Sequence, residues 1–160
     1  MHRLLPLLFL LALTTCAPAP ANDWVELDLT PYDIPLSILA PDSVVVKNSN
    51  LGSVMQDVTV TAPLENYAVQ IFSSQAATND LARLKAEQLE LVRDNRYFER
   101  VVEENPDGFI YENRIDSTAY YGFRHIVYQG DREFVFQNGM ASNFGLEEVR
   151  EIYRAVRNSK

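Results

Sequence analysis

Residues 120–137, YYGFRHIVYQGDREFVFQ, contain two runs of large apolar side chains on either side of Gly130 and Asp131. Two such runs joined by a two-residue loop that begins with glycine predict a β-hairpin with a type II′ turn. This turn fixes which residues face each other across the hairpin, because a slip of one residue would turn every side chain to the other face. The expected pairs are Gln129 with Arg132, Val127 with Phe134, and His125 with Phe136.

Side chains alternate between the two faces of a strand, so one face of this hairpin carries most of its aromatic residues. His125 shares that apolar face with Phe134 and Phe136 and is the only histidine besides His2. We therefore expect His125 to be a neutral imidazole that is buried and hydrogen-bonded inside the core. The alternative is a general base, since the unperturbed pKa of histidine lies near neutrality.

Outward from this hairpin, the chain shows further short β-type runs and two helical periodicities. The expected strand pairs are Ile34–Leu39 with Val44–Lys47, Gln56–Thr61 with Tyr67–Phe72, and Phe98–Glu104 with Phe109–Ile115. A central amphipathic helix is expected from Asn79, its N-cap, to about Arg96, with Leu81, Leu84, Leu89, Leu91 and Val92 buried. A C-terminal helix is expected over Leu146–Arg157. This order predicts an α+β fold in which both helices pack on an antiparallel sheet, an α-β-α sandwich.

The N-terminus is typical of an exported protein. Leu4–Leu13 is an apolar run too short to span a membrane, which indicates a signal peptide. Leu13-Thr14-Thr15-Cys16 resembles a bacterial lipobox, in which Cys16 would carry the lipid and anchor the protein to the membrane. The alternative is cleavage after Ala21, which would release a soluble periplasmic or secreted protein. Residues 1–16 are thus assigned to the signal, 17–30 to a tether or a first edge strand, and 31–160 to one domain.

Composition excludes several classes of function. The 160 residues carry 22 acidic and 14 basic side chains, a formal net charge of −8, which argues against binding to nucleic acid. Acidic residues dominate Asn22–Asp80, where Lys47 is the only base. With a single cysteine, the chain offers no disulfide and no cysteine-ligated zinc. No glycine-rich nucleotide motif is present, and we expect no cofactor and no resident metal.

Other candidate sites are weaker and have ordinary structural explanations. Four tyrosines from neighbouring strands are candidates for a concave ligand face: Tyr111, Tyr120, Tyr121 and Tyr128. A weak calcium site would use the acidic residues Asp23, Glu26, Asp28 and Asp33. A glycosidase would need a carboxylate pair from Glu103, Glu104, Asp107 and Glu112. A serine nucleophile for His125 would be Ser117 or Ser142, but both suit turns, and no G-x-S-x-G motif is present.

The order of elements resembles the PsbP-like superfamily, which includes DcrB-like bacterial envelope lipoproteins. The features that carry the resemblance are Leu36–Pro41 (LSILAP), a hairpin region to Phe72, the helix Asn79–Arg96, hairpin strands to Gln137 and the terminal helix. The resemblance implies a sheet between helices and accessory or binding work without catalysis. The expected function is a non-enzymatic, membrane-tethered accessory or binding domain of the envelope, which holds a protein partner or a small ligand. The alternative is a small periplasmic hydrolase that uses His125.

Overall fold

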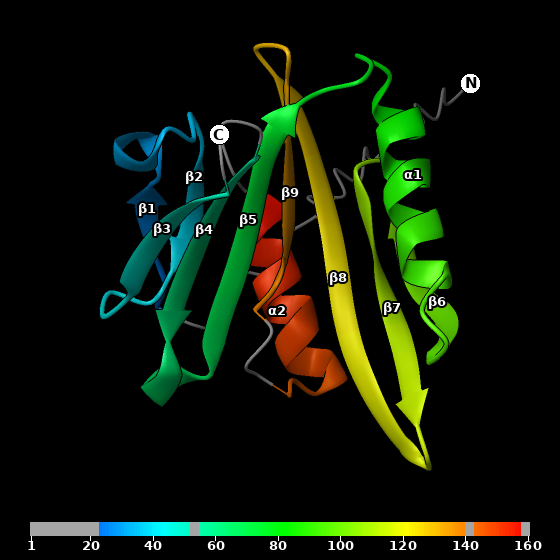
Figure 1. Ribbon diagram of the computed structural model, residues 1–160. Coiled ribbons are helices and arrows are strands. Elements are labelled where there is room, and N and C mark those ends of the chain that lie inside the picture. Colours follow the sequence, from blue (N-terminus) through cyan, green and yellow to red (C-terminus); the bar gives the residue numbers. More distant parts are fainter. Residues whose placement is uncertain (1–22, 52–54, 140–142, 158–160) are drawn as a thin grey trace, which may run out of the picture.

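The predicted hairpin is formed by β8 (Thr118–Gln129) and β9 (Arg132–Asn138), which lie inside the main sheet (Figure 1). The computed structural model describes residues 23–51, 55–139 and 143–157. All three predicted pairs are confirmed, including His125 with Phe136. The predicted turn type is wrong: Gly130 and Asp131 have φ values of 58° and 59°, and two positive φ angles define a type I′ turn. Aspartate tolerates this left-handed conformation better than most residues, and the register is unchanged.

The main sheet has seven strands in the order β3-β4-β5-β9-β8-β7-β6, and every neighbouring pair is antiparallel. Its remaining strands are β3 (Val45–Leu51), β4 (Met55–Ala62), β5 (Tyr67–Gln75), β6 (Phe98–Asn105) and β7 (Gly108–Ile115). A 3-10 turn, Pro63–Glu65, links β4 to β5. The pairing of β5 with β9 joins the two halves of the chain into one sheet, with Ile71 opposite Phe136.

A separate two-stranded sheet is formed by β1 (Val25–Asp28) and β2 (Ser37–Ala40), which a 3-10 turn at Thr30–Tyr32 connects. The sequence left open whether this segment is a tether or an edge strand, and residues 25–28 form a strand. The predicted hairpin between Ile34–Leu39 and Val44–Lys47 is wrong, because β2 pairs with β1 and β3 pairs with β4. Ile38 and Ala40 on β2 are fully buried in the same core cluster as β4. Burying them puts β2 in a second layer over the main sheet instead of beside β3.

The two helices are α1 (Leu81–Arg93) and α2 (Leu146–Arg157). The bounds predicted for α2 are confirmed, whereas α1 is shorter than predicted. Its N-cap is Asp80 and not Asn79: the Asp80 carboxylate accepts hydrogen bonds from the N–H groups of Ala82 and Arg83, at 3.0 and 3.2 Å. Neither described helix has the length and apolar character needed to cross a membrane.

The helices pack on opposite faces of the main sheet, as the alternation of side chains along β7 requires. Leu89 and Val92 of α1 share a small core cluster with Phe109 and Tyr111 of β7. The neighbouring Ile110 points to the other face and joins the larger cluster, which contains β2, α2 and the aromatic residues of β8 and β9. Figure 1 shows α1 over the β6–β8 half and α2 behind the sheet. The chain is thus α+β with mostly antiparallel sheets, but Leu91, predicted to be buried, is 65% exposed.

Candidate ligand-binding cleft

An open cleft lies where β8 continues beyond the end of β7. The last β7–β8 pair joins Gly108 to His125, so the following residues of β8 have no described strand beside them on that side. The cleft has a volume of about 460 Å³ and extends from the start of α1 to the end of α2. We call it the β8 cleft; its lining residues are Leu36, Asn79, Leu81, Asp107, His125, Ile126, Val127, Tyr128, Gln129 and Arg157.

His125 forms part of the cleft wall although its side chain is almost fully buried, with 3% of its surface exposed. Its ring lies 5.6 Å from the ring of Phe136 and 6.3 Å from that of Tyr153, measured between centroids. The predicted burial is therefore confirmed. A hydrogen bond of good geometry to either ring nitrogen is not found among the described residues, and the backbone and carboxylate of Asp107 are the polar groups that act on the ring. The nearest acidic oxygen, Oδ2 of Asp107, lies 3.8 Å from Nδ1, which is too far for a good hydrogen bond.

Two elements bring charged groups to this imidazole. Asp107 comes from the β6–β7 turn, and its Oδ1 lies 3.3 Å from Nε of Arg157 at the end of α2. This Oδ1 atom is also buried without a hydrogen bond of good geometry. Burial lowers the pKa of His125, the charge of Asp107 opposes that shift, and Arg157 adds to it. The ring is therefore neutral at pH 7, with one nitrogen able to donate and the other able to accept.

The lowered pKa of His125 predicts a stability that declines in mild acid. Below pH about 6.5, the usual histidine pKa, the unfolded chain takes up a proton that the folded protein does not. The free energy of unfolding should then fall as the pH falls, by at most about 1.4 kcal/mol per pH unit from this group. Urea unfolding at pH 7.5, 6.5 and 5.5 measures it, with His125→Gln as the variant that lacks this component. Equal pH slopes for the two proteins would contradict the prediction.

On the side of β7, the end of β8 has no pairing strand among the described residues. The N–H of Ile126 donates to the carbonyl of Asp107 at 2.8 Å, which shows that this residue presents its backbone groups toward β7. Direction alternates along a strand, so Tyr128 presents its N–H and C=O to the same side. No described strand pairs with Tyr128 there, since the β7–β8 ladder has already ended. Within the described part of the chain, the cleft therefore contains a short free strand edge at Tyr128.

The four candidate tyrosines do not form one ligand face. Tyr111 is buried against α1, whereas Tyr121 packs against the larger cluster on the opposite face of the sheet. Tyr120 and Tyr128 are eight residues apart on one strand, a separation of roughly 26 Å. Only Tyr128 lines the β8 cleft. The four tyrosines are therefore separated by the alternation of side chains between the two faces of the sheet and by distance along β8.

Most of the candidate catalytic groups lie away from the cleft. Glu103 pairs with Arg150 at 2.5 Å, and Glu104 pairs with Lys85 at 2.8 Å, which lowers the pKa of Glu104. The buried Glu112 is held by Arg100 and Arg114. Ser117 is exposed in the β7–β8 turn, eight residues along the strand from His125 and so roughly 26 Å away. Ser142 and the lipobox Cys16 lie outside the described residues.

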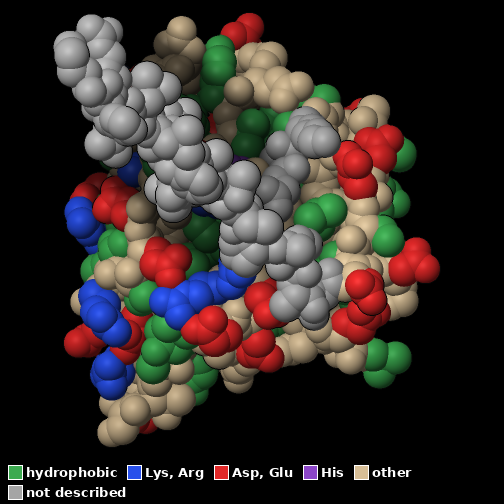
Figure 2. All heavy atoms as spheres, turned by 180° about the vertical axis from the view of Figure 1, so that it is seen from behind, with side chains coloured by type: hydrophobic (Ala, Val, Ile, Leu, Met, Phe, Trp, Pro, Cys, Tyr) green, Lys and Arg blue, Asp and Glu red, His purple; other side chains and the backbone are tan. Residues whose placement is uncertain are grey.

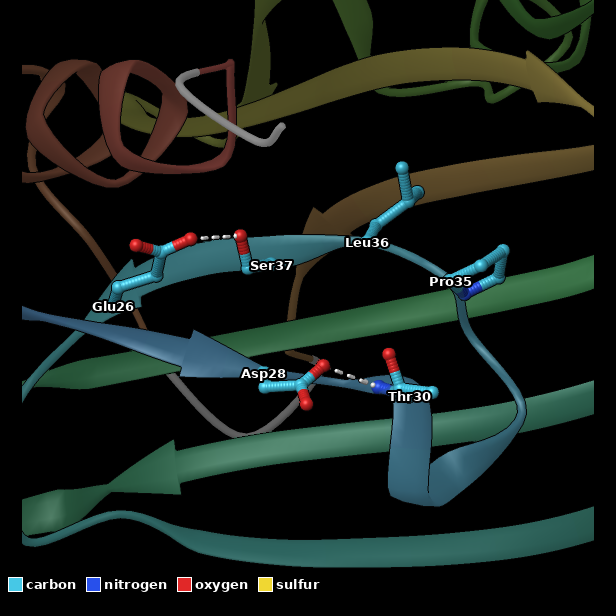
Figure 3. A pocket seen from close by; sticks show the side chains of 6 residues that line it. All are labelled: Glu26, Asp28, Thr30, Pro35, Leu36 and Ser37. Carbon is cyan, nitrogen blue, oxygen red and sulfur yellow. Dashed lines mark hydrogen bonds between the residues drawn. The ribbon is translucent and has the colours of Figure 1, made fainter.

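The acidic N-terminal residues do not converge on a common point. Figure 3 shows that the carboxylate of Glu26 turns to Ser37, whose hydroxyl donates to it at 2.6 Å. Asp28 instead accepts the N–H of Thr30 at 2.9 Å, and this hydrogen bond lowers the pKa of Asp28. Glu26 and Asp28 line one shallow surface pocket, and Asp23 and Asp33 are not among its lining residues. Among the described residues, no three histidine, cysteine or carboxylate side chains lie close enough together to hold a metal ion.

Charge is distributed unevenly over the surface. Figure 2 shows the lysine and arginine side chains gathered on one half of the rear face, while acidic side chains dominate the half that contains β1–β5. Among the described residues that line the β8 cleft, Arg157 is the one lysine or arginine.

No family model, no curated protein and no solved structure matches this chain.

Proposed function

We propose that this protein is a non-enzymatic accessory domain of the cell envelope that binds a partner in the β8 cleft. The observation that supports this proposal is the open cleft itself, about 460 Å³, whose wall contains the buried His125, with no hydrogen-bond partner of good geometry for either ring nitrogen among the described residues. A buried polar atom left without a partner costs about 1–3 kcal/mol. Such unsatisfied groups are uncommon in native proteins.

The same proposal includes export and a lipid anchor at Cys16. It rests on the apolar run Leu4–Leu13 followed by the lipobox-like Leu13–Cys16. Eight residues separate Cys16 from β1, and an extended segment of that length reaches about 28 Å. The kinship with PsbP-like and DcrB-like envelope proteins, and with their α-β-α layering, is proposed on the order of elements alone.

Membrane fractionation tests the anchor. Cys16→Ala should move the protein from the membrane fraction to the soluble fraction, because two acyl chains on one cysteine give firm anchoring. Thr15→Ala, which keeps the cysteine, is the matched control and should remain membrane-bound. Retention of the Cys16→Ala protein in the membrane would contradict the lipoprotein assignment.

Site-specific crosslinking in intact cells tests the cleft. A photoreactive amino acid is placed at Gln129, which is exposed at the rim of the cleft, or at Lys47, which is exposed on the edge strand β3. We expect a discrete adduct from position 129 and none from position 47. Identical adducts from both positions, or none from either, would exclude the β8 cleft as the partner site.

A hydrolase is the second candidate, and the observation that favours it is the proximity of His125 to Asp107, at 3.8 Å. A histidine oriented by a carboxylate is the arrangement that activates a nucleophile. His125→Gln separates the two functions. A hydrolase would lose turnover while it stays folded, whereas a binding domain would lose stability and adduct formation at position 129.

A further inference from the structure

We propose that the last turn of α2, residues 154–157, is a pH-sensitive latch that closes over the neutral imidazole of His125 and opens when this ring takes up a proton. The inference goes beyond the proposed binding function and does not depend on the identity of a partner. It rests on the position of the Asp107 carboxylate, which lies between His125 and Arg157.

Asp107 is the carboxylate that two basic side chains share. Its Oδ1 lies 3.3 Å from Nε of Arg157, and its Oδ2 lies 3.8 Å from Nδ1 of His125. While the imidazole is neutral, this carboxylate balances the charge of Arg157 alone. A proton on His125 would put a second cation beside the first, at a residue that is only 3% exposed, where water screens the two charges poorly.

The other described side chains packed against the imidazole carry no charge. From β9, the ring of Phe136 lies 5.6 Å from that of His125. From α2, the ring of Tyr153 lies 6.3 Å away, and burial raises the pKa of its hydroxyl to about 12, so that it stays neutral. The charged groups that the described elements present to His125 are therefore Asp107 and Arg157.

The end of α2 is the part of this site that can move. The N–H of Ile126 donates to the carbonyl of Asp107 at 2.8 Å. The next residue, Gly108, pairs with His125 in the β7–β8 ladder, so the β6–β7 turn is fixed to β8. Arg157, in contrast, is the last residue of α2, and its side chain is 35% exposed. Helix ends open more easily than paired strands, because their last carbonyl groups have no partners within the helix.

Opening of this turn favours the protonated ring for two reasons. It takes Arg157 away, which leaves the Asp107 carboxylate to His125, and it admits water to the imidazole. The pKa of His125 is lowered in the closed form and returns to about 6.5 or above in the open form. Below that pH the open form binds a proton that the closed form does not, so acid shifts the equilibrium toward opening. Because Arg157 lines the β8 cleft, the same movement removes one wall of the cleft.

Amide hydrogen exchange of the full chain in detergent micelles, followed by NMR from pH 7.5 to 5.5, tests the latch. The reporter is the amide of Val156 and the matched control is that of Val92, since each is a buried valine one residue before the end of its helix. The protection factor corrects for the effect of pH on the intrinsic exchange rate. Protection of Val156 should fall about five- to tenfold, as uptake of one proton with a pKa of about 6.5 requires, and that of Val92 should stay constant.

Three variants identify the groups involved. His125→Gln should abolish the pH dependence at Val156. Arg157→Gln removes the competing cation from the surface, so it keeps the test valid even if His125→Gln does not fold. In this variant Val156 should be less protected at pH 7.5, and the change with pH should be at most half of the wild-type change. Arg154→Gln, an equal change of charge at an exposed residue of the same turn, should keep the wild-type pH dependence.

The contrary results are equally definite. Constant protection at Val156, or an equal fall at Val92, would mean that the last turn of α2 does not open on its own in acid. A fall at Val156 that persists in His125→Gln would mean that another group takes up the proton. A full wild-type dependence in Arg157→Gln would mean that competition for Asp107 plays no part, and each of these results would overturn the inference.

Discussion

Replacing Phe136 with alanine is expected to lower the free energy of unfolding by about 3–5 kcal/mol, the range found for large aromatic side chains removed from a core. Phe136 is fully buried in the middle of the main sheet. It lies opposite Ile71 of β5 and His125 of β8, and therefore at the junction of the two halves of the chain. Urea unfolding followed by circular dichroism measures the change.

Phe72→Ala is the matched control for this prediction. Phe72 belongs to β5, next to Ile71, but points to the other face and is only half-buried. Its removal should cost clearly less than that of Phe136, because less apolar surface returns to water. Equal losses for the two variants would mean that Phe136 does not occupy the core position described.

Gly108→Ala is the second substitution with a large expected effect, about 3 kcal/mol, at the upper end of the usual cost of overpacking. A Cβ atom at this position would lie 2.2 Å from the carbonyl oxygen of Arg124 and 3.0 Å from the Cα of His125. Both are backbone atoms of the neighbouring strand and cannot rotate away. The ladder between β7 and β8 would have to separate at its last pair, Gly108 with His125, and His125 lines the β8 cleft.

The Tyr153 hydroxyl provides a control, because it would also meet the new Cβ, at 2.8 Å. If the backbone contact dominates, Tyr153→Phe combined with Gly108→Ala should recover little of the lost stability in urea unfolding. A nearly complete recovery in the double variant would show that the side chain, and not the β8 backbone, limits this position.

The parts of the fold that the sequence predicts well are those whose information is local. The β8–β9 register follows from the loop Gly130-Asp131, and the bounds of α2 follow from its apolar periodicity and charged ends. The same information predicts β6 and β7 to within a residue or two, because Asn105–Gly108 forms a tight connection.

Pairings between distant segments are not encoded locally. The β5–β9 pairing joins segments separated by α1 and three strands, and no turn specifies it. The pairing of β2 was predicted wrongly because the turn at Pro41 and Asp42 suits a hairpin as well as a crossing between layers. What decides it is the burial of Ile38 and Ala40 in the second layer, which depends on the whole core.

The candidate site shows the same limit. The burial of His125 follows from its place on the apolar face of the hairpin, but its neighbours Asp107 and Arg157 come from a turn and a helix end far away in the sequence. One signal for the cleft was present, since the predicted β8, Tyr120–Gln129, is longer than the predicted β7, Phe109–Ile115. A strand longer than its neighbour leaves backbone groups unpaired at one end.

Hydrogen exchange at two amides of β8 tests the free strand edge most directly. The amides of Ile126 and Tyr128 point to the same side of the strand, but only Ile126 has a described acceptor, the carbonyl of Asp107. Exchange of the full chain in micelles, without added ligand, should be fast at Tyr128 and at least tenfold slower at Ile126. Equally slow exchange at both amides would mean that the edge is already covered, and would contradict the free strand edge described at Tyr128.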